Sequence, residues 1–76
     1  MPATELDVRG FNCPIPVLRT RRALEAMTTG QELRVLATDP AAEIDFKHLC
    51  NVTPHELLNL ERADGELRFL IRRGGA

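Results

Sequence analysis

Polar and apolar side chains alternate in two segments of the first half of the chain, which is the pattern of a half-buried strand. Residues 5–9 alternate in this way, and Gly10 interrupts the pattern. Residues 33–37 also alternate, but the side that carries the charged residues includes Leu36 as well. Because a strand that is apolar on both sides is typical of a sheet interior, we expect this second strand at the centre of a sheet.

The C-terminal third of the chain has the pattern of a β-hairpin. Residues 57–62 are rich in leucine and form an expected third strand, and apolar residues alternate again over residues 67–71. Asp64 and Gly65 lie between these segments, and an Asp-Gly pair is typical of the tight turn that joins antiparallel strands. We therefore predict a hairpin that closes the fold.

Apolar residues at helical spacing predict an amphipathic helix over residues 14–27. Thr28 and Thr29 have low helix propensity, and the following Gly30 is suited to the left-handed conformation that often caps a helix C-terminus. We expect the apolar side of this helix to consist of Val17, Leu18, Ala23, Leu24 and Met27.

A second helix is expected after the central strand. Asp39 can accept hydrogen bonds from the free amides of a helix whose first residue is Pro40. The helical pattern ends near Asn51, before Pro54. We expect the apolar side of this helix to consist of Ile44, Phe46, Leu49 and Cys50.

The elements follow the order strand, helix, strand, helix, strand, strand. This order predicts an α/β (α+β) two-layer sandwich with βαβαββ topology, in which two helices cover one face of a four-stranded mixed sheet. The 76 residues suffice for one hydrophobic core, and neither a linker nor a repeat divides them. We therefore expect a single domain over residues 1–76.

Composition and charge argue against several classes of function. Ten Lys and Arg against eleven Asp and Glu give a net charge of −1, without the basic excess typical of nucleic-acid binding. No stretch approaches the roughly 18 consecutive apolar residues of a membrane span. Residues 1–7 lack the basic and apolar regions of a secretory signal. We expect a cytoplasmic protein that contacts no membrane and binds no nucleic acid directly.

The candidate reactive group is the thiol of Cys13, in the run Cys-Pro-Ile-Pro. The pattern predicts Cys13 at the N-cap of the first helix, with Pro14 at the first helical position and Pro16 in the first turn, where a missing N–H is tolerated. The free amides and the positive end of a helix favour a thiolate, so we expect a pKa moderately below the usual value of about 8.5. The alternative is an ordinary small apolar residue at the end of a loop.

Disulfide exchange within this motif is excluded, because Pro16 occupies the position of the second thiol in a Cys-X-X-Cys motif. A reducing cytoplasm favours free thiols at both Cys13 and Cys50. Cys50 lies on the expected apolar side of the second helix, which indicates a core residue; a resolving or regulatory thiol is the alternative.

Arginine and histidine side chains provide further candidates. Arg19, Arg21 and Arg22 follow Cys13 closely and could dock an acidic partner surface, although solvated side chains are the alternative. His55 is interpreted as a loop or capping residue, with an acid–base or partner-contact role as the alternative. No cluster has the spacing of a zinc site, so we expect no metal and no cofactor.

Residues 7–16, Asp-Val-Arg-Gly-Phe-Asn-Cys-Pro-Ile-Pro, resemble the signature of the TusA/SirA-like family of sulfur carriers, a Cys-Pro-X-Pro motif after a short acidic and glycine lead. The resemblance continues through later landmarks in order and spacing and covers almost the whole chain. One departure is Thr53-Pro54, where the family usually has a glycine just before the histidine. The later landmarks are Asp39-Pro40, Asp45-Phe46, Cys50, residues 55–58 and residues 69–72.

The resemblance implies a sulfurtransferase that accepts a sulfane sulfur as a persulfide on Cys13 and passes it to a downstream protein. Only Cys13 carries over as the sulfur-bearing residue; Gly10, Pro14 and Pro16 are candidate positioning residues of the motif. The implied partners are a sulfur-donor protein of the cysteine desulfurase or rhodanese type and a sulfur-acceptor protein that is DsrE/TusD-like or similar. Family relatives serve tRNA thiolation, molybdenum-cofactor maturation and sulfur oxidation, and the sequence does not choose among them.

Two other classes of function remain as alternatives. A ubiquitin-like carrier bears sulfur on a C-terminal glycine, and residues 72–76 resemble such a tail, but Ala76 argues against this chemistry. A noncatalytic regulatory module that binds RNA or protein could use the arginines. Against it, the chain has no Tyr or Trp, and its three Phe residues fit core positions.

Overall fold

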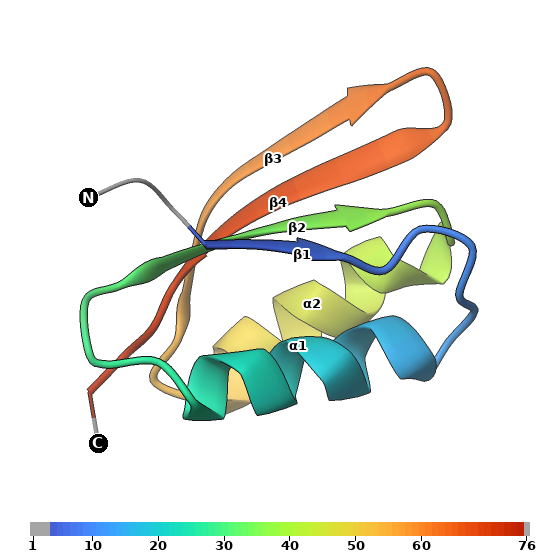
Figure 1. The fold of residues 1–76 in the computed structure, drawn as a ribbon. Helices are drawn as coiled ribbons and strands as arrows, with labels where there is room; N and C mark the ends of the chain where they lie inside the picture. The colour runs from blue at the N-terminus through green and yellow to red at the C-terminus, as the bar shows by residue number, and fades with distance from the viewer. Residues whose placement is uncertain (1–3, 76) are drawn as a thin grey trace.

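The structure, a computed structural model, describes residues 4–75 and has the predicted order of elements. Two helices lie side by side beneath one face of a twisted sheet (Figure 1). The elements are β1 (Thr4–Asp7), α1 (Ile15–Glu25), β2 (Glu32–Ala37), α2 (Ala41–Val52), β3 (Glu56–Ala63) and β4 (Glu66–Arg72).

The four strands form one mixed sheet in the order β1-β2-β4-β3. β1 pairs with β2 in parallel, while β4 is antiparallel to both β2 and β3. The βαβ connection through α1 and the closing hairpin therefore meet at the two central strands, β2 and β4. The predicted fold class is confirmed, and so is the central position of the second strand.

The hydrophobic core fills the space between the sheet and the two helices. Phe46 of α2 and Phe69 of β4 are both fully buried, and their rings meet edge to face with centroids 4.4 Å apart. Such a geometry aligns the positive edge of one ring with the negative face of the other. The remaining core residues are Val8, Leu24, Leu33, Val35, Ala37, Ala42, Leu49 and Ile71.

Both helices bury a narrower side than their apolar pattern predicts. Leu18 of α1 is 51% exposed and Ile44 of α2 is 74% exposed, so the prediction that they face the core is wrong. Pro16 and Thr20 are buried instead, because with Leu24 they form the i, i+4, i+8 row of α1 that faces the sheet. Helical spacing thus identified the helices but not the angular limits of their buried sides.

Several element ends also differ from the predictions. β1 ends at Asp7 and not at residue 9, because the chain turns there and the amide of Phe11 donates to the carbonyl of Val8. α1 ends at Glu25, and its C-cap residue Ala26 is right-handed. Gly30 does adopt a positive φ of 90°, but in the loop that leads to β2 and not as the helix cap.

The hairpin between β3 and β4 is confirmed. Asp64 has a φ of 52° and Gly65 a φ of 75°, as a two-residue turn with left-handed residues requires. Ala63 pairs with Glu66 across this turn. A bulge at Leu58 shifts the register of β3, so Leu57 and Leu60 pack against the core while Asn59 lies on the open face.

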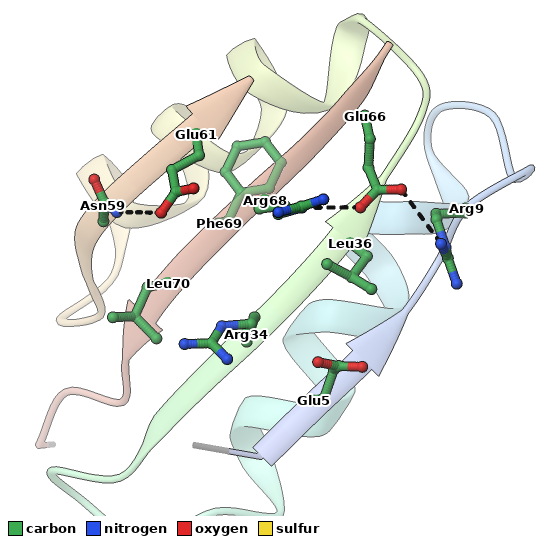
Figure 2. Close-up of a pocket in the computed structure, with 10 residues that line it drawn as sticks. All are labelled: Glu5, Arg9, Arg34, Leu36, Asn59, Glu61, Glu66, Arg68, Phe69 and Leu70. Carbon is green, nitrogen blue, oxygen red and sulfur yellow. Dashed lines mark hydrogen bonds and ion pairs between the residues drawn. The ribbon is translucent and has the colours of Figure 1, made fainter. Parts of the chain in front are cut away.

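The open face of the sheet carries a network of charged side chains (Figure 2). Glu66 is its centre: its carboxylate accepts from Arg68 at 3.0 Å and from Arg9 at 3.3 Å. Arg34 and Glu61 lie on the same face. Within residues 4–75, neither helix has the length and apolar character needed to cross a bilayer.

Candidate functional site: the Cys13 loop

The candidate site is the loop that joins β1 to α1, at the end of the molecule where β2 also passes into α2 (Figure 1). Cys13 lies in this loop, is exposed, and is a free thiol. Its peptide bond to Pro14 is cis. An exposed thiol at the end of the two-layer fold is open to a second protein.

Hydrogen bonds to the β2–α2 connection hold the loop in place. The amide of Gly10 donates to the Thr38 hydroxyl at 2.9 Å, and the amide of Cys13 donates to Asp39 Oδ2 at 2.6 Å. Gly10 has a φ of 84°, a left-handed conformation in which a residue with a side chain would be strained. The positive φ explains why a glycine suits this place in the loop, and the positioning role of Gly10 stays a prediction.

Asp39 joins this loop to the start of α2. Its Oδ1 accepts from the amide of Ala41 at 3.0 Å while Oδ2 accepts from Cys13. The predicted capping of α2 by Asp39 is therefore present as a hydrogen bond. The helix itself begins at Ala41, one residue later than predicted, with Pro40 as its cap residue.

The position predicted for Cys13 at the helix start is wrong by one residue. α1 begins at Ile15 with Pro14 as the N-cap residue, and Cys13 precedes the cap. The amide of Ile15 donates to the carbonyl of Asn12 at 2.9 Å, so the opening turn is formed partly by the loop. Pro14 and Pro16 still fit this turn, because neither position requires a donated hydrogen bond from its nitrogen.

The expected lowering of the Cys13 pKa is also wrong, because the structure raises it. The largest cause is a hydrogen bond with the Asp45 carboxylate, followed by desolvation and by the negative charges of Asp45 and Asp39. Negative charge close to a thiol disfavours the thiolate. The sequence argument considered only the helix start, and these carboxylates come from a segment more than 25 residues away.

Apolar and cationic side chains flank the loop on the side of α1. The Arg19 guanidinium lies over the Phe11 ring, with Cζ 4.4 Å from the centroid, and Phe11 is 38% exposed. Phe11 is therefore not a core residue, contrary to the prediction. Ile15 and Leu18 are exposed as well, and no sequence signal separated them from residues that face the core.

The three predicted docking arginines line one shallow groove along α1. Arg19, Arg21 and Arg22 share it with Ile15 and Leu18. Arg19 contacts the loop that carries Cys13, because its guanidinium lies over the Phe11 ring. Arg21 also lines a second groove, at the far end of α1, which contains no motif residue.

Cys50 packs against the core from α2 and is half-buried. Desolvation raises the pKa of its thiol. Both features fit the interpretation of Cys50 as a core residue, and its placement gives it a less reactive thiol than an exposed one.

His55 lies in the groove at the far end of α1, away from the motif loop, and anchors the C-terminal segment. Its Nδ1 accepts from the amide of Gly74 at 3.0 Å. Desolvation and the nearby charges of Arg73 and Arg21 lower its pKa, against an opposing effect of Glu25. The structure thus gives His55 a loop-anchoring contact and brings it into no contact with Cys13.

No other part of the described chain gathers groups with comparable chemistry. Within residues 4–75 no set of three or more His, Cys, Asp or Glu side chains is arranged to hold a metal ion. The hollow on the open face of the sheet is lined by arginines and glutamates that pair with one another and contains neither cysteine (Figure 2). The exposed Cys13 thiol is therefore the candidate site.

Fold and site together define a small α+β sandwich with one exposed thiol on a loop that is hydrogen-bonded to the β2–α2 connection. Comparison with known proteins agrees with this class: the sequence profile of the family described as "Sulfurtransferase TusA" matches residues 4–73. The chain belongs to the TusA family, as the resemblance of its motif region indicated.

Individual relatives match over nearly their whole length. The protein named "Sulfur carrier protein TusA" of Allochromatium vinosum is 44% identical over 69 residues, which are 91% of each chain. A Neisseria meningitidis relative is 42% identical over 72 residues, 95% of this chain and 97% of its own. The crystal structure of a SirA-like protein from Desulfitobacterium hafniense superposes with a TM-score of 0.79 at 26% identity, covering 95% of this chain and 99% of that one.

Proposed function

We propose that this protein is a sulfur carrier that accepts a sulfane sulfur as a persulfide on Cys13 and passes it to a downstream protein in a sulfur relay. The observation that carries the proposal is the exposed thiol on a tethered loop. Membership of the TusA family and the 44% identity to a protein named as a sulfur carrier support it. The reaction class is that of a sulfurtransferase, which works through a covalent intermediate.

The transfer chemistry needs only one thiol on the carrier. The Cys13 sulfur attacks the outer sulfur of a donor persulfide, a new S–S bond forms, and the donor's inner sulfur leaves as a thiolate that takes up the proton lost by Cys13. The outer sulfur on Cys13 is then attacked by an acceptor thiolate in the same way. No net oxidation occurs, and no cofactor is needed.

Selectivity in this proposal comes from docking, because the thiol is exposed at the surface. Phe11, Ile15 and Leu18 offer exposed apolar area close to Cys13 in the chain, and the Arg19 guanidinium lies over the Phe11 ring. Such a surface fits a partner that presents apolar side chains with an acidic rim. We expect the donor to be of the cysteine desulfurase or rhodanese type and the acceptor to be DsrE/TusD-like or similar.

Arg21 and Arg22 extend the same groove away from the thiol. We assign them to the periphery of the docking surface, where charge affects the association rate more than the final affinity. We expect the carrier to act in the cytoplasm.

A single-turnover transfer experiment tests the proposal. The carrier is loaded with ³⁵S from cysteine by a cysteine desulfurase, separated from the donor, and mixed with an acceptor protein of the DsrE/TusD-like type. We expect label on the carrier and then on the acceptor for the unsubstituted chain and for Cys50→Ser, and neither for Cys13→Ser. Label that enters Cys13→Ser to the same extent would refute the proposal.

A further inference from the structure

We propose that the groove at the far end of α1 binds a small tetrahedral oxoanion such as phosphate or sulfate, held by Arg21, Arg73 and His55. The end of α1, the α2–β3 connection and the C-terminal segment meet at this end of the molecule (Figure 1). The groove contains no residue of the Cys13 motif. The inference therefore goes beyond the proposed function and does not depend on sulfur transfer.

Arg73 presents a half-buried guanidinium that the fold itself fixes in place. Its Nε donates to the carbonyl of Leu24 at 3.1 Å, and one terminal nitrogen donates to the carbonyl of Gly74 at 2.6 Å. These two hydrogen bonds use only part of the N–H donors of the guanidinium. Because both acceptors are neutral carbonyls, they orient the guanidinium without cancelling its positive charge.

Arg21 adds a second cation to the groove from α1. No carboxylate of residues 4–75 lies within ion-pair distance of Arg21 or Arg73, whereas Arg62 and Arg72 each pair with a glutamate. The lining does include one carboxylate, that of Glu25. Two arginines against one glutamate leave the lining with a net charge of +1 while the histidine is neutral. The groove is therefore electrostatically suited to an anion.

His55 supplies a third donor. Its Nδ1 accepts from the amide of Gly74 at 3.0 Å, so the neutral ring carries its proton on Nε2 and can donate it. Desolvation and the charges of Arg73 and Arg21 lower the pKa of this ring, against an opposing effect of Glu25. Since a bound anion would offset the two guanidinium charges, its binding should raise the pKa of His55 again.

The size and the donors of the groove define the class of ligand. Its volume of about 220 Å³ is below the roughly 300–1,000 Å³ of pockets that take drug-sized molecules. Donors that come from three separate segments suit an anion whose oxygens point in several directions, and hydrogen bonds to an ionised acceptor are the stronger kind. Because the groove is open to water, we expect half-saturation at a concentration on the order of millimolar.

The pKa of His55 in the presence of sulfate tests the site, because sulfate stays a dianion throughout the titration of histidine. NMR of the imidazole protons gives the pKa of both histidines of the unsubstituted chain, in sodium sulfate and in sodium chloride at equal ionic strength. We expect sulfate to raise the pKa of His55 above its value in chloride and to do so saturably. The exposed His48 of α2 is the internal control, and its pKa should be the same in both salts. Equal values for His55 in the two salts, or an equal shift of His48, overturn the inference.

Substitution of Arg21 tests which groups hold the anion. Arg21 is exposed, so Arg21→Gln should leave the fold intact. We expect the half-saturating sulfate concentration to rise about tenfold, the effect of losing one charge-assisted contact. The matched control is Arg22→Gln, which removes the same charge from the next residue of α1, outside this groove, and should change that concentration by less than about twofold. Equal effects of the two substitutions, or no effect of Arg21→Gln, overturn the site.

Discussion

Phe46→Ala is the substitution that most directly tests how α2 is fixed to the sheet. Phe46 is fully buried on the side of α2 that faces the sheet, and its ring makes the edge-to-face contact with Phe69. Truncating a buried phenylalanine to alanine costs about 3–5 kcal/mol through lost burial and a residual cavity. A domain of 76 residues has a total unfolding free energy of about 4–11 kcal/mol. We therefore expect Phe46→Ala to remove between about a quarter and all of the stability.

Ile44→Ala is the matched control on the same helix. Ile44 is 74% exposed, and alanine has a higher helix propensity than isoleucine, so we expect a change within about 0.5 kcal/mol of zero. Urea denaturation followed by circular dichroism measures both variants, with the slope of the transition checked for constancy. Equal losses in the two variants, or a loss below about 1 kcal/mol for Phe46→Ala, would refute the placement of α2.

Three further predictions concern the C-terminal segment and the docking surface. The folded state holds the pKa of His55 below its ordinary value of 6.5, so the unfolded chain binds a proton there more readily than the folded chain. The free energy of unfolding should therefore fall as the pH drops from 6.5 through the lowered pKa. Urea titrations at a series of pH values should show a smaller fall for His55→Gln. A methyl group at Gly74 would lie 2.0 Å from the Pro54 carbonyl oxygen, so Gly74→Ala should displace the C-terminal segment from His55. NMR should then show faster exchange of the His55 side-chain protons with water. Gly75→Ala, whose methyl group would lie 3.2 Å from the Thr29 side chain, should leave this exchange unchanged. Arg19→Glu should slow sulfur transfer to an acidic partner about tenfold in stopped-flow measurements, because it removes electrostatic steering. The control is Arg34→Glu on the open face of the sheet, which should change the rate by less than about twofold. Equal effects of the two variants would contradict the assignment of Arg19 to the docking surface.

The sequence predicted the elements and their order correctly because the local signals were strong. A two-residue hairpin turn requires two residues in the left-handed conformation, which few dipeptides other than Asp-Gly adopt readily. In the structure Asp64 and Gly65 both have this conformation. The exposed side of each helix was less predictable. Leu18 and Ile44 fit the helical spacing of apolar residues, but both are exposed in the structure. Which apolar residues of a helix are buried depends on how the helix packs against the sheet, and the spacing alone does not give this.

The sequence identified the candidate residue of the site, Cys13, but not the side chains that surround it. Cys13 was identified as the candidate by its local motif, Cys-Pro-Ile-Pro. The amide of Cys13 donates to Asp39, 26 positions further along the chain, and Asp45, which raises the pKa of the thiol, is 32 positions away. No local sequence pattern encodes interactions between segments so far apart. The direction of the Cys13 pKa was therefore predicted wrongly from a helix-start argument that was sound in itself but omitted the neighbouring carboxylates.

The central claim, that Cys13 carries the sulfur, is tested most directly by locating the added atom. The chain is incubated with a persulfide donor, persulfides are capped with iodoacetamide, and intact mass and peptide mapping follow. We predict a gain of one sulfur atom, about 32 Da before capping, confined to the peptide with Cys13, removed by reductant and absent from Cys13→Ser. A gain that maps to Cys50, or one that persists in Cys13→Ser, would contradict the account.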